Sequence, residues 1–171
     1  MWDPGFDHSG AVSARVLGWH RRFTLVSTIS WGTGDAPGLC AVLHRGGTSW
    51  GRAFTVNPER LEGVLHGLDR REIAYHRRNV WLEIGDGIGV RRQRAWTYVA
   101  NPDHPRLRAD IDPEQQKTLV RQGVGTKGSS LFYLKNTARC LADDGHFHND
   151  ARKFLAMLDI DRANGGDCGN P

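Results

Sequence analysis

The chain has 171 residues, the length of one domain that can bury a single sizeable hydrophobic core. Charged residues make up 25% and hydrophobic residues 39%, as in an ordinary soluble protein, and no run of roughly eighteen apolar residues is present that would span a membrane. The net charge of +4 allows an anionic partner, but the basic residues are spread along the sequence in short clusters. A nucleic-acid-binding protein more often shows a dense basic stripe with interleaved aromatic residues, so we expect a small anionic substrate and no nucleic acid.

The segment MWDPGFDHSG has neither the basic part nor the apolar part of a secretory signal. Cys40, Cys140 and Cys168 are odd in number and widely spaced, which favours reduced thiols over a disulfide framework. Cys40 lies among apolar residues in a predicted strand, so we expect it to belong to the core. These features predict a cytoplasmic protein with no membrane contact, and we expect a monomer.

The first half of the chain is dominated by strand signals. β-Branched and aromatic residues predict strands over residues 11–17 and 19–28, with Gly18 at a bend or bulge, and 32–38 is a loop. Residues 39–44 and 49–56 flank Gly46-Gly47, which predicts a hairpin because two glycines adopt the positive φ of a tight turn.

A helix follows the predicted hairpin. Asn57 is expected to cap this helix and Pro58 to occupy its first position. Its helical spacing of leucine and valine predicts one buried stripe, which consists of Leu61, Val64, Leu65 and Leu68.

The second half reads as two strands and then three helices. The strands are expected over 79–84 and 90–100, and the helices over 112–122, 129–142 and 149–158. This order of elements predicts an α+β domain over residues 1–160 rather than a doubly wound βαβ sheet. The polar, glycine-rich residues 161–171 are expected to form a disordered tail.

Two polar segments contain residue types that occur in binding sites. His146 and His148 lie near three aspartates, but no HExxH or paired CxxC motif occurs, so we expect a polar loop between helices and no metal site. The segment GVGTKG (123–128) lacks the spacing of a phosphate-binding loop. It is interpreted as the end of one helix and the start of the next, where an anionic group can still make a minor contact.

Glu72 stands in GLDRREIAYHRRN (67–79), at or just past the end of the first helix. A single glutamate among arginines is usually a surface ion pair, here with Arg70, Arg71 or a later arginine. The alternative is that Glu72 is the catalytic carboxylate of an active site. The segments around it help to decide between these two interpretations.

Six segments, read in order, resemble the gamma-glutamylcyclotransferase family of the ChaC type. They are VLGWHRRFTLVS (16–27), GTGDAPGLCAVL (32–43), SWGRAFTV (49–56), LDRREIAYHRR (68–78), WTYVANPDHP (96–105) and GTKGSSLFYL (125–134). The resemblance covers almost the whole chain, from residue 1 to about residue 158. It implies a small, closed, mostly antiparallel β-barrel with helices packed outside.

The resemblance also implies a lyase activity without metal or cofactor. Glutathione would be converted to 5-oxoproline and Cys-Gly by attack of its own α-amine on the γ-amide carbonyl. In this family the glutamate matched by Glu72 is catalytic, as base and then acid. We expect Glu72 to face the pocket while Arg70 and Arg71 point away from it. Tyr133 matches the family's pocket tyrosine, and a tyrosine that only fills the seam between helix and barrel is the alternative.

The sequence departs from the family at its start. The family begins with a strand and a Tyr-Gly-Ser-Leu loop that holds the γ-glutamyl end of the substrate, whereas here Met1, Trp2 and Pro4 match only the residues after that loop. On the resemblance, Trp2 is a substrate-binding residue and the first strand is missing. Either the true protein starts upstream, or this is a truncated, inactive homologue that acts in binding or regulation. In-frame codons for the missing loop upstream of Met1 would favour the longer protein.

Two further points concern the substrate. Leu39 follows Pro37-Gly38 where ChaC proteins often carry arginine, so a γ-glutamyl group is more firmly expected than glutathione itself. The remaining alternative is a basic nucleic-acid-binding module, whose binding to DNA would be lost steeply as salt rises.

Overall fold

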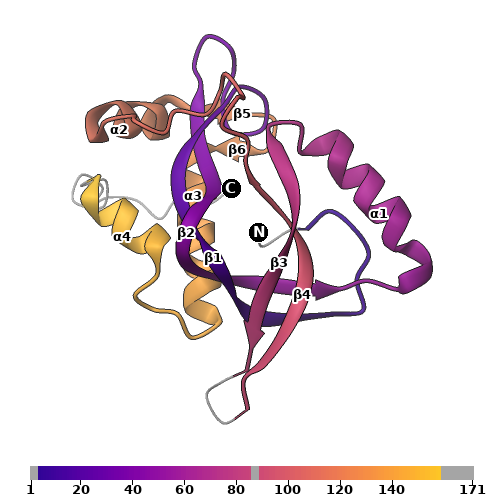
Figure 1. The fold of residues 1–171 in the computed structure, drawn as a ribbon. Coiled ribbons are helices and arrows are strands. Elements are labelled where there is room, and N and C mark those ends of the chain that lie inside the picture. The colour runs from indigo at the N-terminus through magenta and orange to yellow at the C-terminus, as the bar shows by residue number, and fades with distance from the viewer. Residues whose placement is uncertain (1–3, 86–88, 159–171) are drawn as a thin grey trace, which may run out of the picture.

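The computed structural model describes residues 4–85 and 89–158 of the chain, and its strands and helices form an α+β fold (Figure 1). The elements are β1 (Gly10–Ser27), β2 (Gly38–Thr55), α1 (Pro58–Arg71), β3 (Tyr75–Ile84), β4 (Arg91–Ala100), α2 (Pro113–Gln122), β5 (Val124–Gly125), β6 (Gly128–Ser129), α3 (Ser130–Asp143) and α4 (Asp150–Met157). The α+β class predicted from the sequence is confirmed. The predicted tail, residues 161–171, lies outside the described residues.

The main sheet has four antiparallel strands in the order β2-β1-β3-β4. The expectation of a closed barrel is wrong for the described residues, because no ladder of hydrogen bonds joins the two outer strands, β2 and β4. The physical reason lies in the middle of the sheet. β1 pairs with β3 only over Ala14–Val16, whereas it pairs with β2 along nearly its whole length. Two long ribbons therefore cross at a short contact and then diverge (Figure 1).

The predicted hairpin within residues 39–56 is also wrong. β2 is one continuous strand, and both of its halves pair with β1. Gly46 and Gly47 do have positive φ, but they lie opposite Gly18, where the register of β1 and β2 shifts. The glycines on the two strands therefore make a common bend, so that the chain bulges here instead of reversing.

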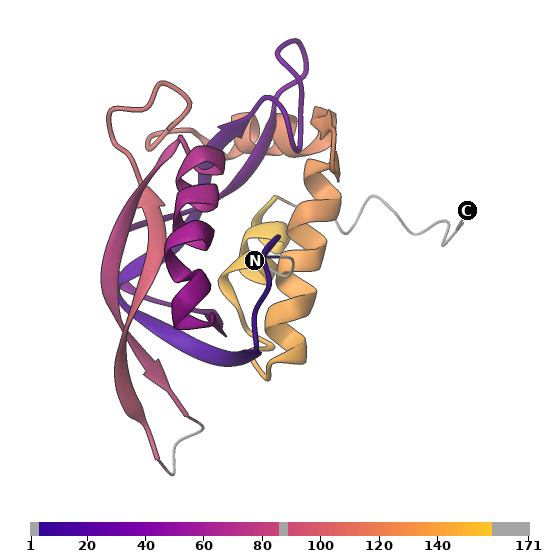
Figure 2. The same ribbon diagram turned by 90° about the vertical axis from the view of Figure 1, so that its right-hand side faces the viewer.

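The helix starts follow the expected capping chemistry. Asn57 accepts a hydrogen bond from the Glu59 N–H at 3.0 Å, as predicted, and side chains at the starts of α2, α3 and α4 do the same for their helices. The predicted buried stripe of α1 is wrong, since no residue of α1 is buried. α1 lies apart from α3 and α4, so its apolar side is only partly covered (Figure 2). None of the helices among the described residues is long and apolar enough to span a lipid bilayer.

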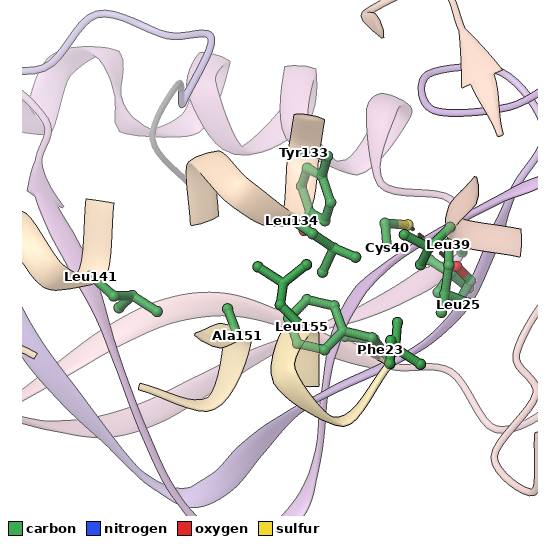
Figure 3. Packing of buried hydrophobic residues seen from close by; sticks show 13 residues of the cluster. Phe23, Leu25, Leu39, Cys40, Tyr133, Leu134, Leu141, Ala151 and Leu155 are labelled. Carbon is green, nitrogen blue, oxygen red and sulfur yellow. Dashed lines mark hydrogen bonds between the residues drawn. The ribbon is translucent and has the colours of Figure 1, made fainter. Parts of the chain in front are cut away.

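The main core lies between the β1–β2 ribbon and the helices α3 and α4 (Figure 3). Phe23, Leu25 and Leu39 of the ribbon pack with Leu134 of α3 and Leu155 of α4, all almost fully buried. Cys40 belongs to this cluster, as expected. A smaller cluster where the ribbons cross is made of Ala14, Val16, Val80 and Leu82.

Three segments meet backbone to backbone beside this core: the loop after β1, the start of β2, and the link between α2 and α3. A Cβ atom on Gly38 would lie 1.9 Å from the Trp31 carbonyl oxygen, and one on Gly123 would lie 2.3 Å from the Gly38 Cα. The short β5–β6 hairpin is held on the same loop, because Thr126 and Lys127 donate backbone hydrogen bonds to Ile29 and Ser30. Only glycine allows this approach.

We predict that Gly38→Ala lowers the free energy of unfolding by about 3 kcal/mol, because the added methyl group meets backbone that cannot rotate away. Gly34→Ala, in the same loop, is the matched control, since nothing lies within 4 Å of its Cβ position. Its effect should stay within about 1 kcal/mol. Urea unfolding curves measure both, and equal midpoints for the two variants would contradict this description of the junction.

Candidate active site

A cavity of about 640 Å³ opens between the end of β1, the turn from α1 to β3, and the start of α3. Its walls are mainly apolar and aromatic, with a few polar and charged groups among them. Its lining residues include Trp31, Cys40, Glu72, Tyr75, Arg106, Lys127 and Tyr133. Glu72 and Tyr133, both expected at a site from the sequence, therefore share one cavity. Trp2, the third expected site residue, lies outside the described residues.

The backbone around Glu72 is fixed on both sides. Glu72 ends α1, where its N–H donates to the Leu68 carbonyl at 2.8 Å, and its own carbonyl accepts from the Tyr75 N–H at 2.9 Å. Ala74 is buried between them, which ties the turn to the core. The Glu72 side chain is only 13% exposed, so it is not an ordinary surface carboxylate.

The expectation that Arg71 points away from Glu72 is wrong. Arg71 Nε donates to Glu72 Oε1 at 2.8 Å, and Arg71 Nη1 donates to the Pro4 carbonyl at 2.9 Å. Arg70 forms no ion pair with Glu72 within the described part of the chain. Among residues 4–85 and 89–158 the carboxylate therefore has one cationic partner, which also binds Pro4 at the start of the described chain.

Two tyrosines bind the backbone of Ala41, in β2, at the cavity wall. The Ala41 N–H donates to the Tyr133 hydroxyl at 3.2 Å, and the Tyr75 hydroxyl donates to the Ala41 carbonyl at 3.2 Å. Burial raises the pKa of both tyrosines, so both stay protonated at neutral pH. Tyr133 also packs against the Trp31 ring at 4.9 Å between centroids. It thus lines the cavity and fills the seam between helix and sheet at once, whereas its contact with substrate stays a prediction.

Besides Arg71, the cavity wall carries two cationic side chains that the sequence does not predict as site residues. Arg106 is held by its carbonyl, which accepts from Val26 N–H, and by its guanidinium, which donates to Thr28. Lys127 lies in the β5–β6 hairpin, within the segment GVGTKG, for which the sequence predicts only a minor contact with an anionic group. Neither side chain forms an ion pair with another described residue. Arg106 carried no local signal, because only the packing of residues 106–108 on β1 brings it here.

The histidine and aspartate cluster near residue 146 has a different position. His146 stacks on Trp50 at 4.0 Å and hydrogen-bonds Ser13 at 2.8 Å. Asp144 binds Arg52, and Asp150 binds Arg21 and Ser49. These contacts join the end of α3 and the start of α4 to the β1–β2 ribbon. In the described residues no three His, Cys, Asp or Glu side chains are grouped as metal ligands.

Cys40 lines the cavity but is predicted to be unreactive. Burial, with a further contribution from the Glu72 charge, raises the pKa of the thiol from 9.0 to about 12. Since the thiol form is favoured until the pH approaches that value, alkylation by iodoacetamide at about pH 8 should be at least a hundredfold slower than for a free cysteine. Peptide mass spectrometry measures this site by site, with the less buried Cys140 as internal control. Equal labelling of both cysteines would contradict the burial of Cys40.

Comparison of this chain with known proteins identifies its family. The family model described as "ChaC-like protein" matches residues 1–160. The chain is 30% identical over 137 residues to a glutathione-specific gamma-glutamylcyclotransferase of Escherichia coli (strain K12), covering 78% of this chain and 58% of the relative. It is 27% identical to glutathione-specific gamma-glutamylcyclotransferase 1 of Mus musculus, covering 81% and 64%. The chain thus spans about three-fifths of the length of these two relatives.

The fold is similar to solved structures as well. The crystal structure of a gamma-glutamyl cyclotransferase specific to glutathione from yeast matches with a TM-score of 0.83 at 17% sequence identity. The match covers 98% of this chain and 94% of the yeast chain. At this identity the likeness shows the shared fold.

Proposed function

This chain belongs to the ChaC-like protein family, and from that premise we propose that it is a gamma-glutamylcyclotransferase acting on glutathione. The observation that carries the proposal is the shared cavity of Glu72 and Tyr133, two residues that the family segments point to independently. Relatives at 26–30% identity that are named for this activity support it. We propose further that the protein works as a cytoplasmic monomer without metal or cofactor.

The proposed reaction is an intramolecular aminolysis. The α-amine of the γ-glutamyl group attacks its own γ-amide carbonyl, which closes a five-membered ring and breaks the amide bond to the cysteine nitrogen. The products are 5-oxoproline and Cys-Gly. Because nucleophile and carbonyl belong to one molecule, the enzyme has to fold the substrate into a ring-closing conformation and move protons.

Glu72 is proposed as the proton carrier. Its carboxylate takes a proton from the attacking amine and delivers it to the leaving cysteine nitrogen, so the base of one step is the acid of the next. The hydrogen bond from Arg71 supports this role by orienting one carboxylate oxygen within a mostly covered site. Tyr133 is proposed to contact the substrate at the same wall, with its buried hydroxyl kept protonated.

Arg106 and Lys127 are proposed to bind the carboxylates of the substrate. Glutathione carries one carboxylate on its γ-glutamyl residue and one on its glycine, and these two side chains bring positive charge to the cavity wall without an acidic partner among the described residues. Their backbones are tied to β1 and to the loop after it, so the charges are held at fixed places. A substrate with two negative ends fits such a cavity better than a neutral γ-glutamyl amine does.

The first test is 5-oxoproline release from glutathione by this chain and by Glu72→Gln. We expect at least a hundredfold lower kcat for Glu72→Gln, because the amide cannot carry the proton. Glu62→Gln, an exposed position on the same helix, should keep the activity of the unaltered chain. Chromatographic detection of 5-oxoproline measures all three.

Two results would contradict the proposal. Near-normal activity of Glu72→Gln would remove the proposed proton carrier. No 5-oxoproline from glutathione, both for this chain and for a version preceded by the Tyr-Gly-Ser-Leu segment, would remove glutathione as the substrate and make γ-glutamyl amines the next candidates. Product from the extended version alone would support a longer native protein.

A second prediction concerns the two cations. Arg106→Met and Lys127→Met should each raise KM for glutathione about tenfold or more with little change in kcat, because a charged hydrogen bond to the substrate is lost. Arg108→Met, two residues further along on an exposed position, is the control. With a γ-glutamyl amine that lacks the glycine carboxylate, at least one of the two variants should match the unaltered chain. An unchanged KM for glutathione in both variants would contradict the carboxylate contacts.

A further inference from the structure

The outer face of the β3–β4 ribbon gathers arginine and tryptophan side chains from two segments of the sequence. In the antiparallel register Trp81 lies opposite Arg94, and Trp96 lies opposite Asn79. Alternate residues share a face, so one face carries Arg77, Trp81, Arg92, Arg94 and Trp96, which we call the Arg–Trp face. Glu83 lies on the same face and pairs with Arg92. The opposite face places Val80 and Leu82 in the small core cluster, so the Arg–Trp face points outward.

Both indoles of the Arg–Trp face are open to solvent and paired with a guanidinium. Trp81 is 48% and Trp96 47% exposed. The Arg94 guanidinium carbon lies 4.9 Å from the Trp81 ring centroid, and that of Arg77 lies 5.2 Å from the Trp96 centroid. These cation–π contacts orient the rings while leaving about half of each residue uncovered. Tryptophan and arginine at this exposure are the residue types that most often carry binding energy at an interface.

The positive charge of the molecule is concentrated on the same ribbon. β3 and β4 contain five arginines and one glutamate, a formal charge of +4, which equals the net charge of the whole chain. The remainder of the chain is therefore neutral on balance. Arg77 and Arg92 are paired with Asp69 and Glu83, whereas Arg78, Arg91 and Arg94 have no acidic partner among the described residues. Of these three only Arg94 belongs to the Arg–Trp face.

We propose that the Arg–Trp face binds single-stranded nucleic acid. Nucleobases stack on the open sides of the two indoles. Arg94, which has no acidic partner among the described residues, contacts phosphate together with Arg77 and Arg92 of the same face. The expectation against nucleic acid rested on basic residues being spread along the sequence. Strand register brings three of the five arginines of the ribbon, Arg77, Arg92 and Arg94, onto one face with the two tryptophans, while the other two lie on the opposite face.

The composition of the face favours nucleic acid over an acidic protein. Carboxylates of an acidic peptide would bind the arginines but would make no use of the uncovered half of each indole. Trp81 and Trp96 are diagonal neighbours across the two strands, about 7 Å apart in such a ladder, so both are within reach of one short run of nucleotides.

The test is fluorescence anisotropy of a labelled oligothymidine titrated with the whole chain. We expect binding at about 50 mM salt that weakens steeply by about 200 mM, as phosphate contacts release counterions. Trp81→Ala and Trp96→Ala should each weaken binding about fivefold to a hundredfold, and Trp96→Phe should keep most of it. Arg94→Gln should weaken binding and flatten its salt dependence.

Controls separate this surface from general charge and from misfolding. Phe147→Ala and Arg121→Gln change an exposed aromatic and an exposed basic residue outside the ribbon, and both should bind as the unaltered chain does. Thermal unfolding of every variant reports on its fold. No anisotropy change at low salt would overturn the proposal. It would also be overturned by tryptophan variants that bind normally, or by polyglutamate that competes as well as the oligonucleotide, which would indicate an acidic protein partner.

Discussion

The contact of bare backbone at Trp31, Gly38 and Gly123 is the constraint on which the cavity depends. It brings the start of α3 against the start of β2, where the buried Ser130 hydroxyl accepts from the Leu39 N–H at 2.9 Å and donates to the Leu39 carbonyl at 2.6 Å. One helical turn later, the Tyr133 hydroxyl accepts a hydrogen bond from the Ala41 N–H. A side chain at the junction would push these layers apart, and the cavity wall would lose its geometry with them.

The site unites segments that are distant in sequence but individually rigid. Glu72 is held by the end of a helix and the start of a strand, and Arg106 and Lys127 by backbone hydrogen bonds to β1 and its following loop. Such positions cost little further ordering when a substrate binds, which suits a reaction whose main demand is correct folding of a flexible tripeptide. The cavity reaches the β3–β4 ribbon at Tyr75, and none of the five residues of the Arg–Trp face lines it, so the two proposed functions use different residues.

Features that depend on neighbouring residues could be predicted from the sequence, whereas features that depend on distant pairing could not. The cap side chains of Asn57 and Asp112 bind backbone N–H groups two or three residues further along. Glu72 stands in the segment 68–78, which resembles a ChaC motif by itself. The hairpin prediction for residues 39–56 failed because Gly46-Gly47 suits a bend as well as a turn, and only the partner strand decides between them. For the same reason the sequence does not predict Arg106 as a site residue, because its position follows from the packing of residues 106–108 on β1.

The hydrogen bonds around Leu39 and Ala41 have a consequence for how molecules of this chain meet. β2 is an outer strand of the sheet, and such strands offer unpaired peptide groups to which another chain can add. At Leu39 and Ala41 these groups are already occupied by the hydroxyls of Ser130, Tyr133 and Tyr75. These three hydroxyl groups thus occupy the hydrogen-bonding positions that the peptide groups of a neighbouring strand would otherwise take. This stretch of the sheet edge is closed to edge-to-edge aggregation, although no further strand among the described residues pairs with it.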